Sequence, residues 1–275
     1  MGDTMTNANS IQPTRRGVVG GIGFGLAASA AGAIAPASAQ TLTKTFVLVH
    51  GAWHGGWCWR RVADLLEAKG HKVFVPTLTG LGEKSHLLDA KVNLATHITD
   101  IVNLIKWEDL KGIVLVGHSY GGYIISGVAE QIQSSIASIV FLDAFVPENG
   151  DSLEAGASQP VKDAIAAAKG KGEIALKPVP ASVFRVNEKD RAWVDSKCTP
   201  QPIATLTDKS TITGAREKIA KKAYIRAKGY PSIPFDAAQA KYKANVAWKS
   251  YEMSAGHDAM VDQPKELTDI LIEVG

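Results

Sequence analysis

The chain has 275 residues, a formal net charge of +3 and 45% hydrophobic residues, with a mean hydropathy near zero. This balance is typical of a folded globular protein and excludes an intrinsically disordered chain. A charge of +3 over this length is too weak to indicate binding to nucleic acid or to an acidic membrane surface, so we expect neither partner.

The first 39 residues have the pattern of an export signal. The pair Arg15-Arg16 precedes a weakly apolar run at residues 18–35, and residues 37–39 (Ala-Ser-Ala) are the small residues that a signal peptidase reads. The alternative is an N-terminal membrane anchor, but the run is rich in glycine and only marginally long enough to span. The paired arginine predicts twin-arginine export to the periplasm or medium, no stable membrane association after cleavage, and a mature domain over residues 40–275.

After the signal, short apolar runs alternate with longer amphipathic ones. In chain order they predict a strand at 46–50, a helix at 59–69, a strand at 72–76, a helix at 94–107, a strand at 113–117, a helix at 121–133 and a strand at 139–142. After a break, strand signals return at 223–227 and 248–253, and a last helix is expected at 265–274. Strict alternation of nearly all-apolar strands with helices indicates an α/β fold, a mostly parallel sheet covered on both faces.

The alternation stops between residues 147 and 216, where prolines, loop residues and a short helical piece at 160–169 follow one another. We interpret this segment as a small helical cap inserted into a single domain, between the fourth and fifth strands.

The sequence Gly117-His118-Ser119-Tyr120-Gly121 fits the pattern G-x-S-x-G, directly after an apolar strand and directly before a helix. In that context the serine lies on a sharp strand-to-helix turn, and the glycines allow the close packing that such a turn requires. Ser119 is therefore the candidate nucleophile. His118 lies within the motif, but we expect it to pack beneath the turn rather than to act as a base.

The base must come from elsewhere, and His257 is the best placed of the seven histidines. It follows the last strand, and loops after parallel strands share one edge of the sheet, so this loop can reach Ser119. The glycine-rich turn after the first strand can aim the backbone N–H of Ala52 at a developing oxyanion, and Tyr120, the residue after the nucleophile, supplies the second donor.

The third member of a catalytic triad is less well defined. The segment after the fifth strand, residues 227–231, contains no carboxylate, and Asp236 further on resembles the N-cap of a helix. Asp143 directly follows the fourth strand in an apolar stretch, where a carboxylate needs a partner such as a histidine N–H. We rank Asp143 ahead of Asp236 as the acid.

Other features carry less information. Five aromatic or histidine side chains are candidates for lining a substrate pocket, and simple packing is the alternative for each of them: Trp53, His54, Phe145, Phe184 and Trp193. In an exported protein, Cys58 and Cys198 could form a single disulfide bond. We prefer the alternative, in which Cys58 is a small apolar residue of the core. No zinc-binding pattern occurs, so we expect no metal and no organic cofactor.

These motifs together resemble the α/β-hydrolase superfamily, and more narrowly the group of plant methyl esterases of the salicylate-binding type and hydroxynitrile lyases. The resemblance is carried by residues 46–57 (FVLVHGAWHGGW), 65–73 (LLEAKGHKV) and 117–122 (GHSYGG), extends from about residue 45 to 151, and returns at Gly256-His257. It implies the α/β-hydrolase fold with a six-stranded sheet, and the order nucleophile, acid, histidine matches the family.

Two departures from the group bear on function. The hydroxynitrile lyases carry a threonine after the first-strand histidine and a lysine after the catalytic histidine, where this chain has Gly51 and Asp258. The family's usual acid position is empty, while related haloalkane dehalogenases place an acid where Asp143 stands but use an aspartate nucleophile in place of Ser119. We therefore predict a serine carboxylesterase acting on a small or medium ester through an acyl-enzyme. The alternatives are a hydroxynitrile lyase-like C–C lyase and a non-catalytic ligand-binding homologue; the sequence leaves monomer and homodimer open.

Overall fold

The computed structural model describes residues 43–275, and the export signal predicted at residues 1–39 lies outside them. Its centre is a six-stranded, all-parallel sheet in the order β2-β1-β3-β4-β7-β8. The strands are β1 (Thr45–Val49), β2 (Lys72–Phe74), β3 (Ile113–His118), β4 (Ile136–Leu142), β7 (Lys221–Ala227) and β8 (Lys249–Met253). The two central strands, β3 and β4, are buried almost throughout, as expected when helices cover both faces.

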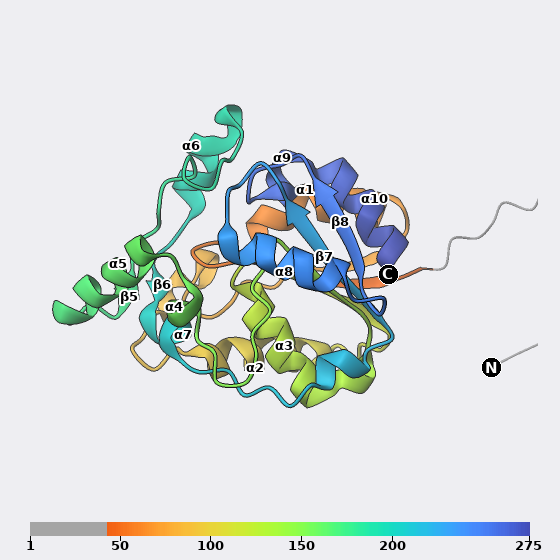
Figure 1. Cartoon of the computed structure of the whole chain (residues 1–275), viewed down its shortest axis with the longest axis horizontal. Helices are drawn as coiled ribbons and strands as arrows, with labels where there is room; N and C mark the ends of the chain where they lie inside the picture. Colours follow the sequence, from red (N-terminus) through yellow and green to blue (C-terminus); the bar gives the residue numbers. More distant parts are fainter. Residues whose placement is uncertain (1–42) are drawn as a thin grey trace, which may run out of the picture. The chain divides into compact units, whose positions relative to one another are not determined.

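The helices pack in groups against this sheet. The main ones are α1 (Arg60–Ala68), α2 (Leu94–Trp107), α3 (Gly121–Ile132), α8 (Ile233–Lys243), α9 (Ala259–Asp262) and α10 (Pro264–Val274). Figure 1 shows α1, α9 and α10 gathered together, with α2 and α3 forming a separate pair, and the contacts between helices agree with this grouping. Short 3₁₀ helices lie at Gly56–Trp59, Gly82–Leu87, Gln133–Ser135 and Ala215–Lys218.

The predicted elements agree with the structure to within a few residues at their ends. The fourth strand is three residues longer than predicted, because Ile136, Ala137 and Ser138 extend it at its start. The helix expected after Asp236 is present as α8, but it begins earlier, at Ile233. The two-stranded antiparallel sheet of β5 (Ala175–Leu176) and β6 (Gln201–Pro202) was not predicted. Strands of two residues carry no periodicity that a sequence pattern could detect.

The segment between β4 and β7 contains the helices α4 (Leu153–Gly156), α5 (Gln159–Gly170), α6 (Glu188–Lys197) and α7 (Ile203–Thr207). Figure 1 shows α5 and α6 lying away from the sheet. Side chains nevertheless tie this segment to the core: both terminal nitrogens of Arg61 donate to the Asp190 carboxylate, at 2.8 and 2.7 Å. No helix within residues 43–275 is both long enough and apolar enough to span a membrane.

Candidate active site

Three predicted site residues lie at the carboxyl edge of the parallel sheet. Ser119 directly follows β3, Asp143 directly follows β4, and His257 lies in the loop after β8. This edge is where parallel α/β sheets bind their ligands, because loops that are distant in sequence converge there. Ser119 is partly exposed, while His257 and Asp143 are 4% and 0% exposed.

Ser119 occupies a strained turn between β3 and α3. Its φ of +53° lies in the left-handed region, which a residue with a side chain enters only when the surrounding structure enforces it. Its carbonyl oxygen accepts hydrogen bonds from the backbone N–H groups of Gly122 and Phe145, at 3.1 and 3.2 Å. A Cβ at Gly117 would come within 2.7 Å of the Gly121 carbonyl oxygen, so the turn requires glycine there. This is the geometry of a nucleophile elbow.

Replacing Gly122 with alanine tests how tightly this turn is packed. An added Cβ would overlap the Phe145 carbonyl oxygen, so the turn and the β4 loop must move apart. We expect Gly122→Ala to lower the free energy of unfolding by about 1–3 kcal/mol in urea unfolding and to lower turnover per folded molecule. Gly170→Ala is the matched control, because nothing lies within 4 Å of its added Cβ. Equal stability of the two variants would contradict the packing described here.

Asp143, which the sequence favours as the acid, contacts the ring of His257. The His257 Nδ1 atom lies 2.6 Å from Asp143 Oδ2, and a carboxylate only accepts, so Nδ1 carries the proton. The other ring nitrogen, Nε2, is thereby left to accept a proton from a nucleophile. Within residues 43–275 no hydrogen bond joins it to Ser119 Oγ, and such contacts commonly tighten only when substrate binds.

Arg226 on β7 supports Asp143 and was not recognised from the sequence. Its Nη1 donates to Asp143 Oδ1 at 2.8 Å, and the backbone N–H of Ala227 donates to the same oxygen at 3.1 Å. Burial alone would lower the pKa of Arg226, but Asp143 and Asp236 raise it, so the guanidinium stays charged. The available signal was Arg226 as the single charged residue of the strand predicted at 223–227, because a buried charge requires a partner.

Asp236 does not contact His257. Its carboxylate is half-exposed and accepts from Arg226 Nε and Lys228 Nζ, both at 3.0 Å. The prediction that it caps the next helix was wrong: α8 has Ser232 at its N-cap position, and Asp236 lies in the first turn, where a carboxylate interacts favourably with the helix dipole.

The two predicted oxyanion donors, the backbone N–H groups of Ala52 and Tyr120, have no acceptor within the described residues. Neither Ala52 N nor Tyr120 N donates a hydrogen bond to another described residue, although both residues are buried. Buried N–H groups without a partner are rare, so a pair beside a candidate nucleophile is available to bind negative charge. Gly51, in the same loop as Ala52, packs closely against the elbow: a Cβ added to it would come within 2.9 Å of the Ser119 Cβ.

A second histidine–carboxylate pair lies beside the first. His54 Nε2 is 2.9 Å from Asp258 Oδ2, and both side chains are fully buried. Burial alone would lower the pKa of His54, but the charge of Asp258 and its hydrogen bond raise it. Conversely, burial would raise the pKa of Asp258, and His54 holds it well below its usual range. His54, which we expected to line a substrate pocket, is 1% exposed, and its ring is held by Asp258 and by the Ala52 carbonyl oxygen.

Aromatic rings surround His257 on several sides. The ring centroids of Tyr230, Phe184 and Phe235 lie 4.7, 5.4 and 5.4 Å from that of His257, and Phe235 stacks nearly parallel to it. The backbone of the segment between β4 and β7 contributes as well, since the Phe184 carbonyl oxygen accepts a hydrogen bond from His257 N at 2.8 Å. Phe184, in the segment between β4 and β7, thus covers one side of the candidate base, and His257 is only 4% exposed.

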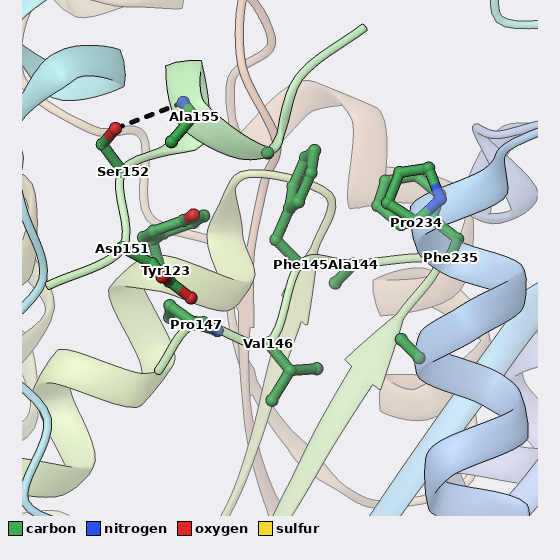
Figure 2. Close-up of a pocket in the computed structure, with 12 residues that line it drawn as sticks. Tyr123, Ala144, Phe145, Val146, Pro147, Asp151, Ser152, Ala155, Pro234 and Phe235 are labelled. Atoms are coloured by element: carbon green, nitrogen blue, oxygen red, sulfur yellow. Dashed lines mark hydrogen bonds between the residues drawn. The ribbon is translucent and has the colours of Figure 1, made fainter. Parts of the chain in front are cut away.

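A cavity of about 310 Å³ is lined in part by Phe235, the residue whose ring stacks on His257. Figure 2 shows Phe145 and Phe235 on one side of it and Tyr123 and Asp151 on the other. Of the predicted pocket residues, only Phe145 lines this cavity. Trp53, Phe184 and Trp193 do not: Trp53 and Phe184 pack on each other, with ring centroids 5.9 Å apart, and half-buried Trp193 packs on Trp57 at 5.1 Å.

No group of three or more His, Cys, Asp or Glu side chains in residues 43–275 is arranged to hold a metal ion. Cys58 and Cys198 are free thiols in the structure, and Cys58 is buried as a small core residue.

The six-stranded parallel sheet with its helices on both sides and a serine at the β3–α3 turn is the α/β-hydrolase fold. Residues 46–270 match the Alpha/beta hydrolase family, so the chain belongs to this family and is a hydrolase.

Known proteins similar to this chain include bacterial and plant esterases. A carbendazim hydrolyzing esterase from Nocardioides sp. (strain SG-4G) is 42% identical, over 84% of this chain and 99% of that protein. Putative methylesterase 13, chloroplastic, from Arabidopsis thaliana is 28% identical, over 84% of this chain and 56% of that protein. An extracellular alpha/beta-hydrolase from a Paenibacillus species, described as homologous in structure and function to tobacco salicylic acid binding protein 2, has a similar structure. Its TM-score is 0.74, with 25% identity over 84% of this chain and 99% of that one.

Proposed function

We propose that the chain is a serine carboxylesterase that hydrolyses a small or medium carboxylic ester through an acyl-enzyme. The observation that carries the proposal is the 2.6 Å contact between His257 Nδ1 and Asp143 Oδ2, at the sheet edge where Ser119 occupies the elbow. The family and its esterase relatives support the same class of reaction.

Each group has a defined part in the proposed mechanism. His257 Nε2 takes the proton from the Ser119 hydroxyl as Oγ attacks the ester carbonyl carbon. The N–H groups of Ala52 and Tyr120 donate to the oxyanion of the tetrahedral intermediate. As that intermediate collapses, the C–O bond to the alcohol breaks and the alcohol leaves with the proton from His257. Water then attacks the acyl-enzyme by the same steps, releasing the acid and restoring Ser119.

Buried Asp143 contributes by stabilising the imidazolium that forms during each step. Arg226 and the Ala227 N–H fix the carboxylate by occupying its other oxygen, so that Oδ2 faces His257. The aromatic rings around His257 favour an apolar or aromatic substrate group near the site.

A panel of p-nitrophenyl esters from acetate to dodecanoate, with carbendazim alongside, tests the proposed class of substrate. We expect hydrolysis that is fastest for the short and medium acyl chains. Cyanohydrin cleavage without ester hydrolysis would favour the lyase alternative, and ligand binding without turnover would favour the non-catalytic one.

We also propose that the protein is exported by a twin-arginine signal and acts in the periplasm or outside the cell, with its chain beginning near Gln40. The support is the sequence of residues 1–39. N-terminal sequencing of the protein recovered from the periplasm or medium tests this, and an intact N-terminus in the cytosol would contradict it.

A further inference from the structure

The His54–Asp258 pair connects the two loops that carry the candidate oxyanion donor and the candidate base. His54 lies two residues after Ala52, in the loop after β1, and Asp258 directly follows His257, in the loop after β8. The contact of 2.9 Å joins positions more than 200 residues apart in sequence. Neither side chain has a part in the mechanism above.

The surroundings of the His54 ring favour a cation. Its Nδ1 lies 2.7 Å from the Ala52 carbonyl oxygen and its Nε2 lies 2.9 Å from Asp258 Oδ2. Both partners only accept hydrogen bonds, whereas a neutral imidazole carries a single N–H, so both contacts are satisfied only by imidazolium. His50 differs, because its Nε2 accepts from Leu78 N at 3.1 Å while its Nδ1 donates to Gly51 O.

The imidazolium restrains the loop in which the oxyanion donor lies. Its Nδ1–H bond holds the Ala52 carbonyl, and the next residue, Trp53, has a φ of +65° that is strained for a side chain of this size. The cap restrains the same turn from the other side, since Trp53 N donates to Gln201 Oε1 and its carbonyl accepts from Thr199 N, both at 2.9 Å.

A third histidine ties the elbow to the base. His118 Nε2 donates to the His257 carbonyl oxygen at 3.0 Å and lies 3.9 Å from Asp258 Oδ1. His54, His118 and Asp258 therefore form a buried network between the oxyanion loop, the nucleophile elbow and the His257 loop. All three side chains are at most 2% exposed.

We propose that His54 and Asp258 are positioning residues: their buried ion pair sets the Ala52 N–H and the His257 ring at the distances from Ser119 that the transition state requires. The pair touches no substrate, so it acts on kcat rather than on substrate binding. The proposal rests on the proposed serine esterase function, and its test includes a readout that does not depend on ester turnover.

Three variants of the full-length protein test the proposal: Asp258→Asn, His54→Gln and the two combined. Because displacing a catalytic group by about 1 Å can cost roughly 10²-fold in rate, we expect kcat for p-nitrophenyl acetate to fall by about that factor while KM stays constant. Rates are taken per active site titrated with a fluorophosphonate, which removes any loss of folded protein. Affinity for a trifluoromethyl ketone, whose adduct uses the same oxyanion donors, is expected to fall in parallel.

Each single substitution leaves a buried charge without its partner, so both single variants are expected to lose stability. The double variant removes both charges and is expected to regain stability without regaining kcat. Glu130→Gln is the control for stability alone, because Glu130 caps the backbone N–H groups of Gly214 and Ala215 away from the site.

The low-field proton resonance of His257 Nδ1–H, bonded to Asp143, reports the position of the ring in solution. We expect it to shift in Asp258→Asn and to stay in place in Glu130→Gln. If kcat per site and the resonance are both unchanged while stability falls, the pair is only structural and the proposal is overturned. If the wild-type protein has no esterase activity but the His257 resonance still shifts in Asp258→Asn, the esterase proposal is refuted and the positioning role is retained. If there is neither activity nor a shift, both proposals are refuted.

Discussion

Ser119→Ala is expected to lower kcat for ester hydrolysis by at least about 10⁴-fold, because the acyl-enzyme needs an oxygen nucleophile that alanine lacks. The Ala52 and Tyr120 N–H groups and the substrate contacts remain, so KM changes little and a residual rate persists. Stopped-flow or steady-state assays with a p-nitrophenyl ester measure both constants. The backbone at position 119 has a φ of +53°, which alanine tolerates no better than serine, so any change in stability is small and separately measurable.

Ser126→Ala is the matched control for this experiment. Ser126 is buried on α3, the helix that begins at the elbow, and its hydroxyl donates to the Gly122 carbonyl oxygen at 2.7 Å. Its replacement removes one hydroxyl near the site without touching the proposed chemistry. Equal activity of Ser119→Ala and Ser126→Ala would refute Ser119 as the nucleophile.

Asp143→Asn is expected to lower kcat by about 10⁴-fold, since an amide can place an N–H opposite His257 and favours the wrong imidazole tautomer. It also removes the charge that neutralises Arg226, whose guanidinium is 1% exposed. Removing one partner of a buried ion pair typically costs about 3–5 kcal/mol, and Asp236, which also binds Arg226, offsets part of that loss. Urea unfolding and kinetics on the same samples separate the two effects.

Asp236→Asn is the control for the choice of acid. The Asp236 carboxylate is 48% exposed, and its bonds to Arg226 and Lys228 lie outside the His257 contact. Exposed ion pairs are worth about 0–1 kcal/mol, so we expect a small loss of stability and an unchanged kcat. A larger kcat loss in Asp236→Asn than in Asp143→Asn would show that Asp236, and not Asp143, is the acid.

The sequence predicted the sheet because its strands are nearly continuous apolar runs. The runs at Ile113–His118 and Ile136–Leu142 are buried in the structure, and the helix at Leu94–Trp107 has the predicted bounds. The placement of Ser119 and His257 on one edge followed from the parallel topology alone. Asp143 was ranked first by the principle that a carboxylate in an apolar stretch needs a partner, and its buried contact with His257 agrees with that ranking.

Contacts between side chains that are distant in sequence could not be predicted in the same way. Arg226 and Asp143 face each other because β4 and β7 are neighbours, and the order of strands in the sheet was not available from a single sequence. His54 and Asp258 lie more than 200 residues apart. Neither residue is flanked by a sequence pattern that indicates a partner. Their pairing depends on how two loops fold over the sheet edge, which local periodicity does not encode.

Labelling the purified protein with a fluorophosphonate, followed by peptide mass spectrometry, tests the central claim most directly. We predict a single phosphonylated residue, Ser119, with labelling lost in His257→Ala because the hydroxyl then has no base to take its proton. Modification at Ser119 that depends on His257 would establish a serine hydrolase. No labelling, or labelling at another residue, would contradict the proposed mechanism.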